Sequence, residues 1–464
     1  MISNLPRRTA SAAHLGLALL VLAFPATGSA QLTLADALRE ADQHAFANRI
    51  AGAATESDRA RARLPLKGIL PSARLDAGVM RTTDPIGAFG TTLRQRLVTP
   101  AAFDPAKLNN PDAITNVLAG VVLEVPLVNG DAWTGWKAAR AAVDASAASQ
   151  DWTAITTRTQ VVRAYYGAIL AAEKATMLQQ AEQAAAAAVR QVQLMVQQGL
   201  VTKADALQAS VRGADVRAQL LAARLDAQTA RQQLGLLLGR EDGSSPDLPT
   251  TLPADDAVRA IAVPDTLPTA TALAATTPRA DVRAATAGLA AARADKQRAT
   301  TTLVPRVNGF ARYDWNDPTA LYSGQKNWTV GVMASWSLFG GGSELADIAG
   351  TSARLASARA GHAAATAQQQ VDAESTRRGI AVALERLDLA VQAAEQAQEA
   401  HRLVDKRYVG GLATVAELLA AESAATGAAL MRVAARYAVI DAVASHRRAI
   451  GADPGALRAL ESAR

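Results

Sequence analysis

The sequence predicts a mainly helical fold with four β-strands, built as two similar halves, and two features carry this prediction. All 18 prolines lie outside two long windows, Leu127–Ser245 and Thr319–Asp453. Because a helix tolerates proline only in its first turn, these windows permit very long helices. Segments in which apolar and polar residues alternate lie before or at the start of each window, and a period of two is typical of a strand.

The composition excludes several classes of protein. The 464 residues include no cysteine, so disulfide frameworks, cysteine-ligated metals, thiol nucleophiles and a lipid-modified N-terminal cysteine are excluded. The 48 Lys and Arg barely exceed the 42 Asp and Glu, which gives no support to nucleic-acid binding. Half of the residues are hydrophobic but only 4% are aromatic, and the hydrophobic half is largely alanine. This favours long, closely packed helices over large globular cores.

Residues 1–30 have the layout of a secretory signal peptide. Arg7 and Arg8 precede the apolar stretch Leu15–Phe24, and small residues follow at positions 28–30. The apolar stretch is too short to span a bilayer as a helix. We find no later apolar run of the roughly 18 residues that a membrane helix needs. We therefore expect an exported protein that is either soluble or held in a membrane by something other than helices.

Each proline-free window predicts a helical hairpin. Apolar residues in the windows alternate at spacings of three and four, a coiled-coil seam, for example Leu207, Val211, Ala214, Ala218, Leu221 and Leu225. Glycines interrupt the windows just before Thr202 and Thr414, and these threonines stand three residues before Asp205 and Glu417. This is the pattern of a helix C-cap followed by a capping box. A helix from about Trp133 to Gln198 would be roughly 100 Å long.

Four segments predict strands with one apolar and one polar face, at about 72–79, 117–127, 306–315 and 327–339. Strands of this length cross a bilayer when tilted, with the apolar face towards lipid. Five of the six tryptophans lie near strand ends, as in the aromatic girdles of membrane barrels: Trp133, Trp136, Trp315, Trp328 and Trp336. The alternative to membrane-crossing strands is a small soluble sheet with one face towards water. Four strands cannot close a barrel, so several subunits would have to share one.

The two halves of the chain match one another in order and spacing. Leu70-Pro71 corresponds to Val304-Pro305, and Gly199-Leu200 corresponds to Gly411-Leu412. The loop of the first predicted β-hairpin, roughly 82–115, is longer than that of the second. Each half therefore has the order helix, strand, strand, long helix, turn, helix, and the duplication predicts one structural unit used twice.

Five motifs resemble the TolC-like outer membrane efflux proteins. In chain order they are LTLADALREA, PLVNGD, QQGLVTKADALQAS, SLFGGG and RYVGGLATVAELLAAES. The resemblance covers essentially the whole chain after residue 30. It implies a homotrimer whose strands form one 12-stranded β-barrel in the outer membrane of a Gram-negative bacterium, continued by a helical tunnel across the periplasm. It also implies a passive, porin-like channel that is not lipidated and works with a periplasmic adaptor and an inner-membrane pump.

The resemblance assigns roles to named parts of the chain. The predicted division is a signal peptide (1–30), N-terminal periplasmic helices (31–70), a first β-hairpin in the outer membrane with a long external loop (71–128), a first helical hairpin (129–239), a proline-rich linker (240–278), a helix of the second repeat (279–303), a second β-hairpin (304–339), a second helical hairpin (340–450) and a C-terminal tail (451–464). The adaptor would dock on the hairpin tips, at Gly199, Leu200, Thr202, Gly411, Leu412 and Thr414.

The periplasmic gate would involve Tyr408, Glu417 and Asp205. Three copies of Glu417 around an axis would form a carboxylate ring that favours cations; alternatively, Glu417 serves only as the capping partner of Thr414. Ala413 and Ala420 stand where the best-known member of the family has a basic and an acidic residue. We therefore expect a gate held more by helix packing than by salt bridges. For the cargo, multidrug efflux with a pump of the resistance-nodulation-division kind is favoured over type I protein secretion.

Two other classes of function are weaker. An enzyme lacks support because the chain has no zincin, nucleophile-elbow or phosphate-loop motif, and Gly340–Gly342 lacks the lysine of a phosphate loop. We expect no catalytic, cofactor or metal site, and we expect the scattered histidines to lie at the surface: His44, His362, His401 and His446. A soluble periplasmic coiled-coil adaptor or scaffold is the other alternative, and it would be extracted without detergent.

Overall fold

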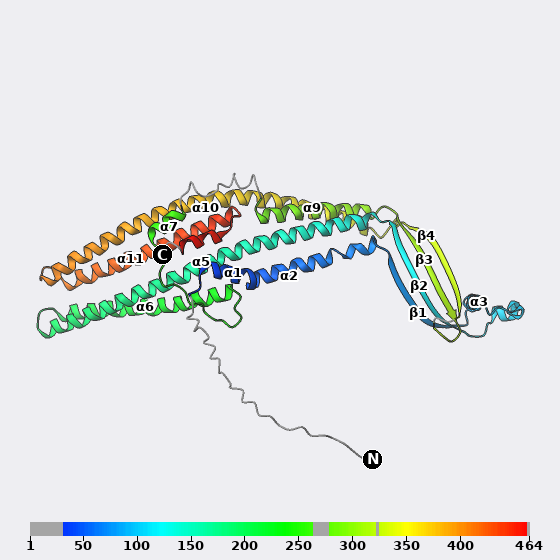
Figure 1. Ribbon diagram of the computed structural model, residues 1–464, viewed down its shortest axis with the longest axis horizontal. Coiled ribbons are helices and arrows are strands. Elements are labelled where there is room, and N and C mark those ends of the chain that lie inside the picture. The colour runs from blue at the N-terminus through cyan, green and yellow to red at the C-terminus, as the bar shows by residue number, and fades with distance from the viewer. Residues whose placement is uncertain (1–30, 263–277, 322–323, 462–464) are drawn as a thin grey trace, which may run out of the picture.

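The computed structural model describes residues 31–262, 278–321 and 324–461. The molecule is a long rod of helices with a single β-sheet at one end, and the two helical hairpins form the other end (Figure 1). The predicted signal peptide and part of the linker, 263–277, lie outside the described residues. Mainly helical structure, four strands and internal duplication are all confirmed.

The two predicted helical hairpins are present and nearly equal in size. In the first, α5 (Gly130–Gln197, 68 residues) is followed by α6 (Lys203–Leu237, 35 residues). In the second, α10 (Ser343–Val409, 67 residues) is followed by α11 (Val415–Ala449, 35 residues). At 1.5 Å per residue, α5 and α10 are each about 100 Å long. α5 therefore confirms the predicted helix from about Trp133 to Gln198, and α10 is its counterpart in the second half.

The main hydrophobic core lies midway along the rod. Shorter elements surround the long helices there: α1 (Leu34–His44), α7 (Asp255–Ile261) and the 3-10 helix η4 (Pro454–Leu460). Tyr165 and Tyr166 of α5 are fully buried among them. The expectation for His446 was wrong, because it is buried there with its ring nitrogen 3.0 Å from the Thr376 hydroxyl. The linker and the tail therefore help to build the core.

Two further helices, α2 (Phe46–Arg61) and α9 (Ala280–Thr301), run beside α5 towards the sheet and occupy equivalent positions in the two repeats (Figure 1). A 3-10 turn, η1 (Leu64–Gly68), leads from α2 into the first strand. Each repeat therefore delivers one short helix and one long helix to the sheet.

The sheet is antiparallel in the order β1-β2-β3-β4. Its strands are β1 (Ser72–Thr82), β2 (Ile114–Val128), β3 (Arg306–Asp317) and β4 (Gln325–Ser335). The last strand was predicted to reach Phe339 but ends at Ser335. The Trp336 indole N–H donates to the Leu303 carbonyl at 3.0 Å, and Gly341 and Gly342 have positive φ values of 69° and 84°. These features turn the chain away from the sheet and into α10.

The register confirms the predicted separation of faces, because directly paired residues share a face. One row across the sheet is Leu75, Val121, Tyr313 and Trp328, and the next row is Asp76, Gly120, Asp314 and Asn327. Figure 1 shows the strands curving together as one layer. One face of the sheet is therefore almost entirely apolar and the other carries the charged and amide side chains.

The connection between β1 and β2 is more ordered than a loop. It contains α3 (Pro85–Arg94), the 3-10 helix η2 (Pro100–Phe103) and α4 (Pro105–Asn109) at the free end of the sheet (Figure 1). The connection between β3 and β4 has no comparable insertion in its described residues. The two repeats differ most at this end.

One helix of the described residues, α11, is long and apolar enough by length and composition to cross a membrane, with a mean hydropathy of 1.2 over its best window. We expected no apolar segment of this length after residue 30, and α11 shows that this expectation was wrong. Alanine supplies much of the apolar character, and α11 packs along α10 for its whole length in the rod (Figure 1). This observation is much weaker than the two-faced sheet as an indication of the membrane-facing part.

Candidate functional site

The turns at the two hairpin tips have the same backbone structure. Gly199 and Gly411 adopt φ values of 73° and 74°, a left-handed conformation that glycine reaches without a steric penalty. The backbone N–H of the residue after each glycine donates to the carbonyl five residues earlier. Leu200 donates to Met195 at 2.9 Å, and Leu412 donates to Arg407 at 2.7 Å. Both tips are therefore Schellman caps, and the duplication extends to individual hydrogen bonds.

Both predicted capping boxes are present. The Thr202 backbone N–H donates to Asp205 at 2.9 Å, and the Thr414 N–H donates to Glu417 at 2.7 Å. The threonine hydroxyls accept from the backbone N–H groups of the same two acidic residues. Hydrogen bonds from the Thr202 side chain and backbone lower the pKa of Asp205, and those from the Thr414 backbone and side chain lower the pKa of Glu417. Both carboxylates therefore stay charged at neutral pH.

Each tip exposes a leucine at the end of the rod. Leu200 is 65% exposed and Leu412 is 73% exposed, and a side chain added at Gly199 or Gly411 would meet open space. Exposed apolar side chains at matching positions of two hairpins are a feature of contact surfaces. The structure thus brings all six predicted docking residues to one end of the molecule.

Tyr408 connects the two hairpins just behind the tips. Its hydroxyl donates to the Met195 sulfur at 3.4 Å, and its ring packs on a small cluster formed by Val192, Ala209, Val415 and Leu419. Burial, and then the charge of Asp205, raise the pKa of Tyr408. Within the described residues no ion pair joins the hairpins at this end. Glu417 is engaged by its own cap, and a gate held by helix packing stays a prediction.

The five tryptophans form two groups at opposite ends of the sheet. Trp315 and Trp328 lie near the free end on the apolar face, and Trp315 stacks edge-on with Tyr313 at 4.8 Å. Trp133, Trp136 and Trp336 lie at the helical end, where the first two rings are 6.0 Å apart. Trp328 and Trp336 are separated by about 27 Å of extended chain. In strands tilted by about 40° this is roughly 21 Å along the barrel axis, which is close to the height of about 25 Å of the apolar band of a membrane barrel.

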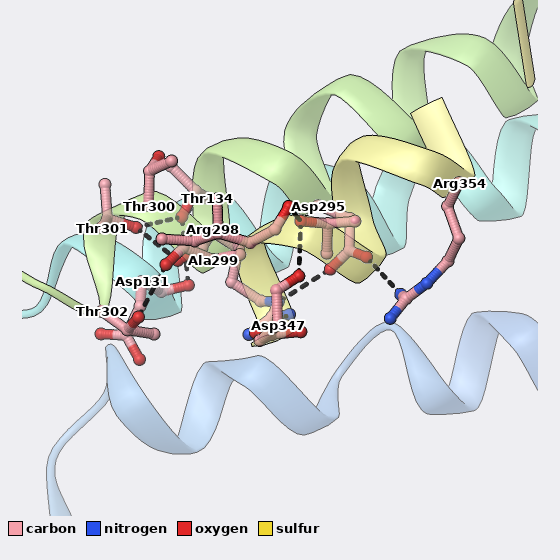
Figure 2. Close-up of polar contacts among 12 residues, drawn as sticks. Asp131, Thr134, Asp295, Arg298, Ala299, Thr300, Thr301, Thr302, Asp347 and Arg354 are labelled. Carbon is pink, nitrogen blue, oxygen red and sulfur yellow. Dashed lines mark hydrogen bonds and ion pairs between the residues drawn. The ribbon is translucent and has the colours of Figure 1, made fainter. Parts of the chain in front are cut away.

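Sequence reasoning missed an ionic network where the sheet joins the rod. Figure 2 shows Arg298 of α9 placed between Asp295 and Asp347, while Arg354 of α10 reaches the other oxygen of Asp295. The three contacts lie between 2.7 and 2.9 Å. The Thr134 and Thr301 hydroxyls, 3.1 Å apart, connect α5 to α9 beside this network. These contacts hold together the ends of α5, α9 and α10 that lie next to the sheet.

A second missed cluster lies in the middle of the rod. Arg279, whose side chain is only 2% exposed, binds Asp281 at 2.7 Å and Asp372 at 3.0 Å. Its guanidinium also lies 4.8 Å from the ring centre of Trp152, the sixth tryptophan. Asp372 and Trp152 lie far from Arg279 in the sequence and leave no local pattern. No group of three or more potential metal ligands was found in the described ranges.

A family model described as "Outer membrane efflux protein" matches residues 51–240 and 274–452, one match for each repeat. A membrane protein from Pseudomonas aeruginosa has a similar structure, with a TM-score of 0.77, 19% identity and 91% of each chain covered.

Two further solved structures share the fold. The outer membrane protein VceC from Vibrio cholerae has a TM-score of 0.73 and 20% identity, covering 91% of this chain and 96% of its own. The CmeC outer membrane channel from Campylobacter jejuni has a TM-score of 0.74 and 15% identity, covering 96% and 94%. The search of curated proteins found no match.

Proposed function

This chain belongs to the outer membrane efflux protein family, and from this premise we propose that three copies form the outer-membrane duct of a three-part export system. The duct conducts substrates passively from an inner-membrane pump and a periplasmic adaptor to the outside. The family assignment favours a channel over a soluble adaptor and over an enzyme.

The two-faced sheet with open edges carries this proposal. β1 and β4 pair on one side only in the described chain, and unpaired backbone groups are not tolerated in lipid. Pairing β4 of one copy with β1 of the next satisfies both edges. Three copies supply an even and closable number of strands, with the apolar rows towards lipid and the charged rows towards the lumen.

The rod suits a crossing of the periplasm. Its helices of about 100 Å end in the exposed pair Leu200 and Leu412. We assign adaptor docking to these tips and the closure of the tunnel to the Tyr408 cluster behind them. A pump of the resistance-nodulation-division kind is our first choice because that kind is the most frequent in the family, and a type I secretion system is the second.

Conductance of the purified protein in planar bilayers tests the channel. We expect single-channel steps that favour cations, and Glu417→Gln, which keeps the capping geometry, should lower the cation preference. If the wild-type protein gives no channels, the proposal is wrong. If Glu417→Ala leaves both conductance and selectivity unchanged, Glu417 serves only as a cap.

Site-specific crosslinking tests the docking assignment. Because the sequence has no natural cysteine, an introduced cysteine is the only thiol that can react. Leu200→Cys and Leu412→Cys should crosslink to the adaptor in cells. Val371→Cys, equally exposed but in the middle of α10, is the matched control. Crosslinks from Val371 that exceed those from both tips would refute the assignment. Extraction of the protein without detergent would favour the soluble scaffold instead.

A further inference from the structure

The insertion between β1 and β2, residues 83–113, is the largest difference between the repeats and has no role in the proposed channel so far. Its helix α3 presents one buried face, at Ala88, Thr91 and Gln95. Each of these side chains is 3% exposed, and their spacing of three and four places them on one side of the helix. A loop that only connected two strands would not need such a face.

A ladder of buried amides fastens this helix to the sheet. The Gln95 side-chain NH₂ donates to the Asn116 oxygen at 2.9 Å and to the Thr115 carbonyl at 2.9 Å. The Asn116 NH₂ in turn donates to Asn316 of β3 at 2.9 Å. All three amide side chains are almost completely buried. The ladder therefore joins the insertion of the first repeat to a strand of the second.

The ladder lies on the polar face of the sheet. Asn116 and Asn316 occupy even positions of β2 and β3, on the same face as Glu124, Arg312 and Asp314. From this anchor α3 packs against β2 and reaches β4, so it crosses the free ends of the strands. In a barrel with polar side chains inward, this is the lumen side of the outer mouth.

The ladder holds the insertion to the sheet, but the packing between them is not dense. A cavity of about 520 Å³ lies between it and the start of β2, lined by Phe89, Leu97, Leu108 and Ile114 among others. The Gln95 side-chain oxygen is buried and has no hydrogen-bond partner in the described structure. Arg96, two residues after the end of α3, adopts a φ of 54°, a conformation that L-residues rarely take. A docked state with these defects can be released at small cost.

We propose that residues 83–113 form a lid over the outer exit of the channel, closed by the Gln95–Asn116–Asn316 ladder. The inference rests on the proposed barrel. Twelve strands about 4.8 Å apart and tilted by about 40° enclose a radius of roughly 12 Å. A helix with its side chains is about 10 Å wide, so three copies on the lumen face obstruct most of the opening. The lid limits the size of solutes that pass.

Access to the lumen from outside tests the lid independently of the periplasmic gate. Thr329→Cys places a thiol on the polar face of β4, opposite Arg312, and Ala101→Cys places one on the exposed insertion. Intact cells are treated with a membrane-impermeant maleimide. We expect Ala101→Cys to react rapidly and Thr329→Cys slowly.

Two second-site changes should open the lid. Gln95→Leu removes the two hydrogen bonds that attach the insertion to the ladder, at similar volume, and replacing residues 83–113 by a short turn removes the lid. Gln95→Leu should speed labelling of Thr329→Cys by about tenfold, as expected when one or two hydrogen bonds of the closed state are lost. The variant without the insertion should speed it by at least as much. The matched control is Arg94→Leu, on the exposed side of the same helix, and it should leave the rate unchanged.

The outcomes separate the two proposals. If Ala101→Cys does not react in intact cells, the predicted orientation in the outer membrane fails. If Ala101→Cys reacts but Thr329→Cys reacts at one rate with and without the insertion, the lid is overturned and the channel stands. The variant without the insertion keeps the test decisive if Gln95→Leu does not fold.

Discussion

The middle of the rod and the hairpin tips are built from the same four long helices, yet they are stabilised very differently. In the middle, Tyr165 and Tyr166 are fully buried and stack edge-on at 5.2 Å. The Tyr165 hydroxyl donates to Leu32 at 3.0 Å and to Glu461 at 2.9 Å, so both ends of the described chain are attached there. At the tips, the buried cluster has only Val192, Ala209, Val415 and Leu419.

This difference indicates which part of the rod can change shape. Free energy of folding is concentrated where apolar burial is greatest. The middle combines the largest core with buried ion pairs, whereas the tips depend on two caps and one weak hydroxyl–sulfur contact. We therefore expect opening of the periplasmic end to leave the middle of the rod intact.

The largest effect should come from truncating a tyrosine in the middle. Tyr166→Ala removes a fully buried ring and should cost about 3–5 kcal/mol of unfolding free energy. The matched tip variant, Tyr408→Ala, should cost less than about 1 kcal/mol because its ring is only partly buried. Thermal unfolding followed by circular dichroism in detergent measures both. Equal losses at the two positions would contradict the comparison.

Arg279 should be the next most sensitive position. Arg279→Met removes the buried guanidinium and leaves the partly exposed carboxylates of Asp281 and Asp372 without it, which should cost about 1–3 kcal/mol. Arg283→Met breaks an exposed pair with Asp151 one turn along α9 and should cost about 0–1 kcal/mol. Chemical denaturation of both variants gives the two values. A small loss for Arg279→Met would show that the middle is held by apolar packing alone.

A smaller and local effect is expected at the tips. Thr414→Ala removes the cap of α11 and should cost about 1 kcal/mol of local helix stability. Hydrogen exchange should quicken in the first turn of α11, while the global melting temperature stays close to that of the parent. Thr202→Ala should do the same for α6. If either variant melts globally at a clearly lower temperature, the tips are not independent of the middle.

The pH dependence of the tips sharpens the same comparison. Capping lowers the pKa values of Asp205 and Glu417 below their ordinary values of 3.8 and 4.5. A carboxylate with a lowered pKa stabilises the folded state above its ordinary value, and this contribution is lost as the pH falls through the lowered pKa. A spin label at Leu412→Cys should therefore become mobile below about pH 4.

Two controls belong to that experiment. Glu417→Gln keeps a capping side chain without a charge, so the label should show little pH dependence in this variant. A label at Val371→Cys in the middle of α10 should stay immobile over the same range. Simultaneous mobility at both labels would indicate global acid unfolding in place of fraying at the tip.

The features that sequence reasoning recovered are those with a short-range cause. The two capping boxes were predictable because Thr and its acidic partner stand three residues apart in both hairpins. The two-faced sheet was predictable because alternation fixes faces. The length of the last strand was missed because the hydrogen bond from the Trp336 indole to the Leu303 carbonyl, together with Gly341 and Gly342, ends the strand early.

The sequence by itself determined the lengths of the helices, the faces of the strands and the turns at both tips, since each depends on residues within a few positions of one another. Only the tertiary structure decided that Arg279 meets Asp372, that Arg298 joins α9 to α10, and that the insertion lies on the polar face. Gln95 and Asn316 belong to different repeats, and Asn116 is 200 residues from Asn316. Such pairs follow from how the two repeats pack together, which no local pattern encodes.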